Sequence, residues 1–328
     1  MATHTKTNFL EDFEQHIENI LRWDEKSSFS AEPTLFAAAR HLCLAQGGKR
    51  ARPKLVYFFA KSLQQFGSQV MDIAACAEFI HNASLLHDDV IDNGTLRRGV
   101  PTANVVWDDL TAVLAGDILL AESIHILKDC PRIVANEALK LVSDMTKATM
   151  LEAHVRNSVS VSIPQWEYIA HGKTSAMFGW CGRAIGHLAG DFKAVEAFGT
   201  FGHHFGLAFQ LADDVVDIQH SDSGKTPFAD LRNKNPSYPI IYACQNSETF
   251  RNKLQQTWMN EHPSEKEIEQ LGRELCAAPI LNHCVDRIQK EVDLSIQALG
   301  EYAKKPGCQE IAQWALAMCY RFQRSEAV

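Results

Sequence analysis

The chain has 328 residues, of which 46% are hydrophobic, and a formal net charge of −8 at pH 7. This length allows one large domain or two smaller ones. The acidic balance argues against nucleic acid as a partner, because a phosphate backbone is bound by an excess of Lys and Arg. Nine scattered cysteines without a CxxC pair indicate neither zinc nor a disulfide framework and fit a reducing cytoplasm.

Residues 1–15 contain neither an apolar core nor a cleavage site of small residues, so we expect no signal peptide. No stretch reaches the roughly 18 uncharged apolar residues of a membrane-spanning helix. The most apolar candidate, Thr111–Leu127, is interrupted by Asp117 and Glu122. We therefore expect a soluble, cytoplasmic protein, although its ligand need not be water-soluble.

The N-terminal part has the apolar spacing of helices. Apolar residues recur every three or four positions in Phe9–Leu21, and a second helical pattern covers Ala37–Leu44 and stops at Gly47-Gly48. The cationic segment 49–53 follows, and then the apolar run Leu55–Ala60. A glycine pair before cations at a helix start can cradle an anion. An ordinary loop with solvated cations explains the same residues.

The next predicted helix, Val70–Asp92, ends in an acidic cluster of Asp88, Asp89 and Asp92. On a helix, Asp88 and Asp92 point to one side. Like charges at this spacing destabilise a bare helix, so the cluster requires a counter-charge, and Mg2+ holding a phosphorylated substrate suits one or two carboxylates per ion. A solvated acidic face is the alternative, but the apolar neighbours are unsuited to a surface helix.

Arg97 and Arg98 lie one loop beyond these carboxylates, after Asn93-Gly94-Thr95 ends the helix. The two arginines could form salt bridges with the aspartates. They could equally grip a diphosphate, because planar guanidinium groups bind phosphate in a two-pronged manner.

Four further helices are predicted, separated by Pro131, Pro164 and polar breaks: Ala112–Leu127, Ile133–Val155, Gln165–Ala189 and Val195–Ile218. Lys173 in the third of these reads most simply as a surface lysine with a buried stem. The adjacent His203 and His204 diverge by about 100° on a helix, which favours a polar edge over a metal pair.

The acidic pattern occurs a second time, as Asp213, Asp214 and Asp217, again among apolar residues. Residues 221–239 read as one long loop, and 240–325 alternate helical runs with breaks at prolines. We find no period-two alternation and no hairpin signal, so the fold class is all-α. Because the two acidic clusters must meet in space to act together, we expect one domain over residues 1–328.

These motifs together resemble the trans-isoprenyl diphosphate (polyprenyl) synthases, in their order along nearly the whole chain. They are GGKRARP at 47–53, LLHDDVIDNGTLRRG at 85–99, GKT at 172–174, FQLADDVVD at 209–217 and GKTPFADLRNK at 224–234. The resemblance implies a single-domain antiparallel helical bundle around a deep central cavity, with the two aspartate motifs facing each other at its mouth. It also implies a homodimer and peripheral membrane association for product release.

The resemblance also implies roles for individual residues. Three Mg2+ ions bridging the allylic diphosphate would be held by Asp88, Asp89, Asp92, Asp213, Asp214 and Asp217. The allylic diphosphate itself would be held by Arg97, Lys173, Gln210, Lys225 and Lys234, with Thr174 lining the cavity. Isopentenyl diphosphate would be held by Lys49, Arg50, His81 and Arg98. The allylic partner would be farnesyl or geranylgeranyl diphosphate.

The sequence departs from the family pattern at three places. The glycine and glutamine of a Gly-Glu-x-x-Gln motif are missing around Glu152, the run after Lys234 is one residue longer, and Phe228-Ala229 stands where a glycine is usual. These departures concern loop geometry and closure of the metal site.

Product length is expected to depend on Ala83 and Ser84, one helical turn before Asp88. In the family, a bulky aromatic there stops growth at short products. Two small side chains leave a tunnel open, which predicts a long all-trans, octaprenyl-like product used for a quinone side chain. A floor supplied by Leu119, Leu120 or Ile124 would instead give a C20 or C25 product.

Other protein classes share parts of this pattern. A terpene cyclase needs neither a second aspartate motif nor the cations Lys49, Arg50 and Arg98, and a head-to-head synthase is disfavoured likewise. A non-catalytic subunit of a heteromeric prenyl synthase would show eroded aspartates, whereas all six are present. A plain helical interaction protein leaves the paired motifs unexplained.

Overall fold

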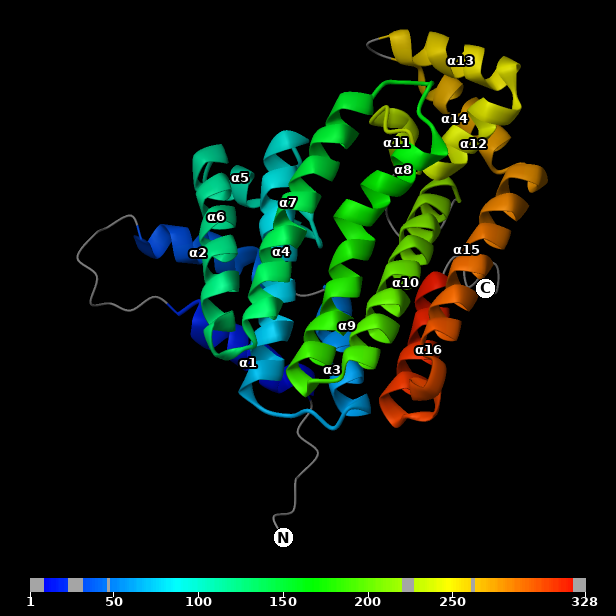
Figure 1. The fold of residues 1–328 in the computed structure, drawn as a ribbon. Coiled ribbons are helices and arrows are strands. Elements are labelled where there is room, and N and C mark those ends of the chain that lie inside the picture. Colours follow the sequence, from blue (N-terminus) through cyan, green and yellow to red (C-terminus); the bar gives the residue numbers. More distant parts are fainter. Residues whose placement is uncertain (1–8, 23–31, 46–47, 220–226, 261–262, 321–328) are drawn as a thin grey trace. The chain divides into compact units, whose positions relative to one another are not determined.

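The computed structural model describes residues 9–22, 32–45, 48–219, 227–260 and 263–320 (Figure 1). Within these ranges the regular structure is helical apart from one short hairpin, which confirms the all-α prediction. The residues group into two compact units, Met1–Leu139 with Cys181–Val195 and Lys140–Trp180 with Glu196–Val328. The expectation of a single domain stays a prediction.

The first unit is built around the long helix that carries the first acidic motif. Its elements are α1 (Phe9–Ile20), α2 (Glu32–Cys43), α3 (Ala51–Ser62), α4 (Ser68–Ile91), β1 (Leu96–Arg97), β2 (Val100–Pro101), α5 (Ala103–Val106), α6 (Asp109–His125) and η1 (Ile126–Asp129). Helix α4 packs on α6, α3, α1 and α2. The small buried residues Ala112 and Ala115 of α6 allow close packing of this helix.

The second unit contains most of the C-terminal half. Its elements are α8 (Ile163–Ala170), η2 (His171–Ser175), α11 (Ala229–Arg232), α12 (Tyr238–Asn246), α13 (Glu248–Met259), α14 (Glu265–Leu275), α15 (Ala278–Ala298), η3 (Gly300–Lys304) and α16 (Pro306–Cys319). A buried apolar cluster that includes Phe228, Leu254 and Trp258 unites α11 to α14. This cluster supports the segment that follows the second acidic motif.

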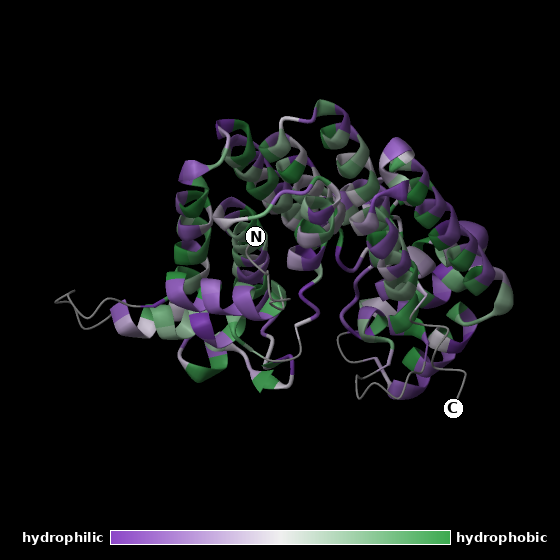
Figure 2. Ribbon diagram, turned by 90° about the horizontal axis from the view of Figure 1, so that it is seen from below, coloured by the Kyte–Doolittle hydropathy of each residue, from purple (hydrophilic) through white to green (hydrophobic). Residues whose placement is uncertain are grey.

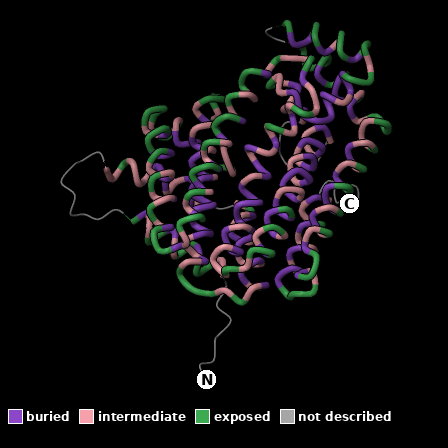
Figure 3. The backbone as a smooth tube through the Cα atoms, in the orientation of Figure 1, coloured by how far each residue is buried: buried purple, intermediate pink, exposed green. Residues whose placement is uncertain are grey.

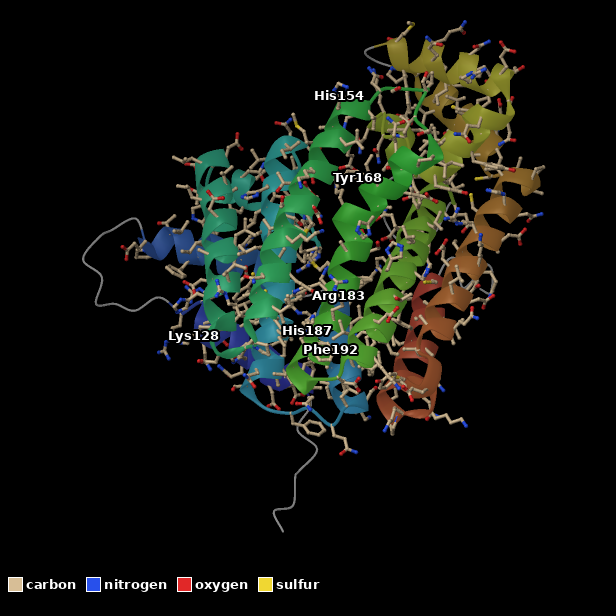
Figure 4. All side chains as sticks on the ribbon, in the orientation of Figure 1. Lys128, His154, Tyr168, Arg183, His187 and Phe192 are labelled. Carbon is tan, nitrogen blue, oxygen red and sulfur yellow. The ribbon has the colours of Figure 1, made fainter. Side chains whose placement is uncertain are left out.

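Three helices have residues in both units: α7 (Arg132–Val155), α9 (Ala176–Ala189) and α10 (Phe192–Ile218). Buried and exposed residues alternate along α7 with the helical period, whereas no residue of α9 is exposed (Figure 3). Arg183 and His187 lie one turn apart on α9 (Figure 4). Both reach Glu137 of α7, with Nε of Arg183 2.8 Å and Nε2 of His187 3.3 Å from its carboxylate oxygens.

The sequence prediction missed one hairpin, because its turn has an unusual residue. Strands β1 and β2 pair antiparallel, with Arg97 opposite Val100. The two-residue turn is Arg98-Gly99, with φ of 53° and 79°. Positive φ at both positions is the geometry of a hairpin turn normally signalled by Asn-Gly or Asp-Gly. An arginine at the first position gave no such signal.

Two further local predictions were wrong in part. The expected continuous helix Gln165–Ala189 is interrupted by η2, one turn of π-helix at His171–Ser175. The expected loop 221–239 contains α11 and the start of α12, and its residues 221–226 lie outside the described ranges. Both differences arise from tertiary contacts rather than local propensity.

The stretch Asp109–Asp129, covering α6 and η1, is long and apolar enough to cross a membrane by length and composition, with a mean hydropathy of 1.7. Core helices of water-soluble proteins share this property.

Hydrophobic residues are not confined to one element, and green and purple positions alternate along most helices (Figure 2). Val113 and Leu114 are exposed on α6, so this helix presents an apolar side that its own unit does not cover.

Candidate active site

The first acidic motif lies at the C-terminal end of α4. Asp92 is the C-cap residue and its N–H donates to the carbonyl of Asp88 at 2.8 Å. The last turn of α4 contains no basic residue, and the negative end of the helix dipole adds to the charge of the carboxylates. Asp88 and Asp92 are one turn apart on the same side of α4. This arrangement favours a bound cation.

Asp89, the middle carboxylate, is anchored inside the protein. It is 2% exposed, and Nε of Arg97 donates to its two oxygens at 2.8 and 3.0 Å. Nη2 of Arg97 lies 2.7 Å from Oδ1. The hairpin turns Arg97 back onto α4, so the salt-bridge alternative is the one seen for this arginine. The side chain of Arg97 remains 32% exposed.

A cluster of cations surrounds His81 in the same unit. Burial, and then the charges of Arg52, Arg98, Arg97 and Arg50, lower the pKa of His81 well below its usual value. The imidazole is therefore neutral near pH 7. Burial also lowers the pKa of Arg98, whose Nη1 donates to the carbonyl of Leu42 at 3.2 Å. Such a concentration of positive charge favours the binding of an anion.

Arg50 and Lys49 differ sharply in their surroundings. Lys49 is exposed, whereas Arg50 is 6% exposed and adopts a left-handed backbone conformation with φ of 46°. Its Nη1 donates to Oε1 of Glu78 at 2.8 Å and its Nη2 to the carbonyl of Cys43 at 2.7 Å. The guanidinium predicted to hold isopentenyl diphosphate is thus bound by protein groups.

The second acidic motif, on α10, also has a buried middle carboxylate. Asp214 accepts hydrogen bonds at 3.0 Å from Nε1 of Trp166, Nε2 of Gln210 and the backbone N–H of Tyr238. Burial raises its pKa to about 7, against the effect of these three donors, and the charge of Asp213 raises it further. Asp213 and Asp217 are one turn apart and partly exposed. This repeats the pattern of the first motif.

The π-turn η2 presents Lys173 and Thr174 in the second unit. Nζ of Lys173 pairs with a carboxylate oxygen of Glu152. Oγ1 of Thr174 donates to Oε1 of Gln210 at 2.9 Å, which links η2 to α10 and, through Gln210, to Asp214. Lys173 is therefore part of an ion pair rather than a surface lysine, and π-turns of this kind occur frequently at functional sites.

Imidazole groups stabilise the same π-turn. Oγ of Ser175 lies 2.9 Å from Nδ1 of His171 and 3.2 Å from Nδ1 of His203. Burial, and then the charges of His171 and His204, lower the pKa of His203 to about 4. Nδ1 of the adjacent His204 lies 2.7 Å from Oε2 of Glu291.

The segment after the second motif folds back onto Asp217. Its two oxygens accept from the N–H groups of Ala229 and Asp230, each at 3.0 Å. Nζ of Lys234 donates to the carbonyls of Trp258 at 2.7 Å and Asn260 at 3.0 Å. Lys234 therefore caps the end of α13 here. The predicted Lys225 lies outside the described residues.

The two motifs have ligands suited to a divalent cation bound together with phosphate. In the part of the chain that the structure describes, no group of three or more His, Cys, Asp or Glu side chains could hold a metal ion. Mg2+ uses one or two carboxylates and completes its coordination with water and phosphate oxygens. The pairs Asp88/Asp92 and Asp213/Asp217 supply such carboxylates, so the residues present fit magnesium.

A sequence model of polyprenyl synthetases matches residues 32–275. The chain belongs to the polyprenyl synthetase family. It is 29% identical over 304 residues to an all-trans-nonaprenyl-diphosphate synthase (geranyl-diphosphate specific) of Rhodobacter capsulatus, covering 91% of this chain and 93% of that one. It is 30% identical over 263 residues to an octaprenyl diphosphate synthase of Haemophilus influenzae, covering 77% and 78%. As a member of this family, the protein is a trans-prenyltransferase.

The fold of this polyprenyl synthetase agrees with that assignment. A crystal structure of a decaprenyl diphosphate synthase from Rhodobacter capsulatus has a TM-score of 0.87 and 27% identity, covering 95% of this chain and 96% of that chain. The family and fold class implied by the resemblance are therefore confirmed.

One departure from the family pattern has a structural explanation in this synthetase. Phe228 stands where a glycine is usual and has a left-handed φ of 57°, a conformation that costs a non-glycine residue about 1–2 kcal/mol. Its ring is 1% exposed within the apolar cluster of α11 to α14. Burying a phenylalanine ring contributes about 1.5–3 kcal/mol, which offsets the strain.

The residues predicted to control product length lie on α4 of the synthetase. Ala83 is fully buried, and Ser84 is partly exposed with its Oγ donating to the carbonyl of His81 at 2.8 Å. Of the alternative floor residues on α6, Leu119 is buried and Leu120 and Ile124 are partly exposed.

Three residues of the site were missed by sequence reasoning. Arg52, in the first turn of α3, is the strongest charge acting on His81. Trp166 donates to Asp214, and Glu78 binds Arg50. Arg52 could have been found, since it lies in the cationic segment 49–53. Trp166 and Glu78 gave no signal, because their partners are 48 and 28 residues away.

Proposed function

We propose that this prenyltransferase condenses isopentenyl diphosphate with an allylic diphosphate in the presence of Mg2+ and builds a long all-trans polyprenyl diphosphate. The observation that carries the proposal is the repeated acidic motif. In both copies the middle aspartate is buried and hydrogen-bonded, and the two outer aspartates lie one helical turn apart and are at least partly exposed. A non-catalytic binding protein would have no need for two acidic motifs of this kind.

The two diphosphates are assigned to different groups. Isopentenyl diphosphate is assigned to the cationic cluster of Lys49, Arg52, His81 and Arg98, because neutral His81 can donate or accept a hydrogen bond among fixed positive charges. The allylic diphosphate is assigned to the aspartate motifs through magnesium, together with Arg97 and Lys173, and Lys225 and Lys234 remain further candidates for this group.

The chemistry explains these residue types. Magnesium, when bound, supplies Lewis acidity toward the leaving diphosphate. Lys173, whose Nζ pairs with Glu152, is assigned to the negative charge that develops on the leaving diphosphate, and its neighbour Thr174 is hydrogen-bonded to Gln210. The allylic cation is attacked by the double bond of isopentenyl diphosphate and a proton is then lost, so water must be excluded. No side chain is assigned as the base, since the released diphosphate can accept this proton.

The product is proposed to be octaprenyl-like. Ala83 and Ser84 are small, and no aromatic side chain occupies these positions of α4. The long-chain relatives support this proposal. A floor at Leu119, Leu120 or Ile124 remains the alternative and would give a C20 or C25 product.

We also propose a cytoplasmic location and a homodimer. All nine cysteines are free thiols, which agrees with a reducing cytoplasm. The exposed apolar residues of α6 agree with a homodimer or with contact to a membrane surface during product release.

The deciding experiment is an incubation of purified protein with Mg2+, labelled isopentenyl diphosphate and farnesyl or geranylgeranyl diphosphate, followed by product sizing. We expect a ladder that ends near C40. A stop at C20 would keep the reaction and place the floor on another helix. Absence of product from every primer would overturn the catalytic proposal in favour of a non-catalytic subunit.

A further inference from the structure

We propose that Glu78 and Arg50 are positioning residues that hold the cationic cluster in shape before an anionic substrate arrives, and that Arg50 does not itself contact the diphosphate. This inference deepens the proposed function and rests on it, because it concerns the isopentenyl diphosphate site. It reassigns Arg50 from a substrate ligand to a structural support of its neighbours.

The first observation is that the donor groups of Arg50 are directed to three separate helices. Nη1 donates to Glu78 on α4 at 2.8 Å, Nη2 to the carbonyl of Cys43 at the end of α2 at 2.7 Å, and Nε to Glu14 on α1 at 3.2 Å. A guanidinium has its donors in a rigid planar fork. Turning it toward a substrate would break all three contacts together.

The second observation is the burial of the Arg50–Glu78 pair. Arg50 is 6% exposed and Glu78 is 2% exposed, whereas Glu14 is 55% exposed. An unpaired charge at this depth is strongly unfavourable, so each of the two requires the other. Glu14 contributes less, because its carboxylate is largely in solvent.

The third observation is that Glu78 also acts on Arg98. Its negative charge opposes the lowering of the pKa of Arg98 that burial and the charges of Arg50 and Arg97 produce. Glu78 therefore offsets repulsion between two neighbouring guanidinium groups. It lets Arg50 and Arg98 remain charged side by side.

The fourth observation concerns the backbone between the two arginines. A Cβ atom at Gly48 would lie 3.1 Å from Nη1 of Arg98, so this guanidinium lies against the glycine. The same Cβ atom would lie 3.6 Å from Nη1 of Arg50, so both guanidinium groups approach Gly48, and Arg50 itself has a left-handed backbone conformation. The ion pair between Arg50 and Glu78 thus sets the position of Lys49 and the space available to Arg98.

The test compares Glu78→Gln, Glu78→Asp, Arg50→Lys, Arg50→Gln and the double variant Glu78→Gln/Arg50→Gln, with Glu14→Gln as the matched control. We expect Glu78→Gln and Arg50→Lys each to raise the KM for isopentenyl diphosphate about tenfold. The KM for farnesyl diphosphate and kcat should change by no more than about twofold. The double variant should be no worse than the worse single variant, Glu78→Asp should recover part of the loss, and Glu14→Gln should behave as wild type.

Several results would overturn the proposal. An unchanged or lower KM in Glu78→Gln, or additive effects in the double variant, would show that Arg50 acts on the substrate directly. If Glu78→Gln raised the KM for isopentenyl diphosphate and the KM for farnesyl diphosphate equally and also lowered the thermal midpoint, the role of Glu78 would be purely structural. Should Glu78→Gln fail to fold, Arg50→Lys and Glu78→Asp carry the same comparison.

Calorimetric titration with inorganic pyrophosphate in the presence of EDTA separates this test from the proposed function. Without magnesium the aspartate motifs repel the anion, so the titration reports on the cationic cluster. We expect weaker binding by Glu78→Gln than by wild type. Equal binding would overturn the positioning role. A wild-type protein that binds pyrophosphate but makes no product would instead count against the proposed reaction alone.

Discussion

The middle aspartate of each acidic motif is buried, with 2% exposure for Asp89 and 5% for Asp214, whereas its two neighbours in the motif are at least partly exposed. Asp89 is held by Arg97, and Asp214 is held by Trp166, Gln210 and Tyr238. A carboxylate that is both buried and hydrogen-bonded is less accessible to an ion than a partly exposed one. We therefore assign metal binding in the first instance to the outer residues of each motif, and an orienting role to Asp89 and Asp214.

Replacing an outer aspartate should abolish turnover without unfolding the protein. For Asp88→Ala and Asp213→Ala we expect a fall in kcat of about 10³-fold, because several kcal/mol of stabilisation of the leaving diphosphate depend on the metal. Steady-state kinetics over a magnesium titration provide the measurement, and the thermal midpoint should stay within a few degrees of wild type. Near-normal turnover in both variants would remove the metal assignment.

Replacing Ala83 tests the tunnel. Ala83→Phe adds a ring at a fully buried position, so we expect shorter products and a cost of about 1–3 kcal/mol in stability. Product sizing after incubation with farnesyl diphosphate is the measurement. The control is Leu114→Phe on the exposed side of α6, which should leave product length unchanged. A full-length ladder from Ala83→Phe would show that the chain grows along another path.

At the scale of the element, the segment after the second acidic motif depends on a single aromatic side chain. The ring of Phe228 packs where a Cβ atom at Gly272 of α14 would approach within 2.4 Å. This contact places α11 on α14. Through the N–H groups of Ala229 and Asp230 it also fixes the carboxylate of Asp217.

Gly272→Ala should therefore disturb the second motif from a distance. We expect a loss of about 1–3 kcal/mol in the free energy of unfolding, because the added methyl group meets the buried ring. Adding Phe228→Leu should cost less in this background than in wild type, since the smaller side chain leaves room. Urea unfolding of wild type, the two single variants and the double variant measures the coupling between Gly272 and Phe228. Strictly additive losses in the free energy of unfolding would argue against the contact.

The helices could be predicted from sequence because their apolar residues follow the 3.6-residue period and end at Gly, Asn or Pro. The backbone at Arg98 and Phe228 could not, since left-handed conformations of these residues follow from the contacts of their side chains. The acidic motifs were recognisable from spacing alone. The separation into outer and middle aspartates was not, because it depends on donors far away in sequence, such as Trp166.

At the scale of the whole molecule, partly buried imidazole groups contribute to its response to acid. Burial lowers the pKa of His81, His203 and His283. A histidine whose folded pKa lies below its ordinary value binds fewer protons in the folded state than in the unfolded state. Its contribution to stability is present above pH 6.5 and is lost as the pH falls toward the folded pKa.

His203 allows a direct test of this effect. Its folded pKa of about 4 places the loss between roughly pH 6.5 and pH 4. We expect the variant His203→Gln to lose less stability than wild type when urea unfolding is compared at about pH 7 and about pH 5. Parallel losses in the two proteins would show that His203 does not titrate in this window.

The nine free cysteines have a practical consequence. Eight of them are buried and only Cys276 is partly exposed. Burial raises the pKa of Cys130 and Cys244 to about 11 and of Cys181 and Cys284 to about 12, so few of these sulfurs are thiolates at neutral pH. Because these cysteines occur in both units, a thiol-reactive dye would be nearly silent on the native enzyme and would gain signal wherever the chain opens. The native cysteines can therefore report local unfolding in both units without the introduction of any new cysteine.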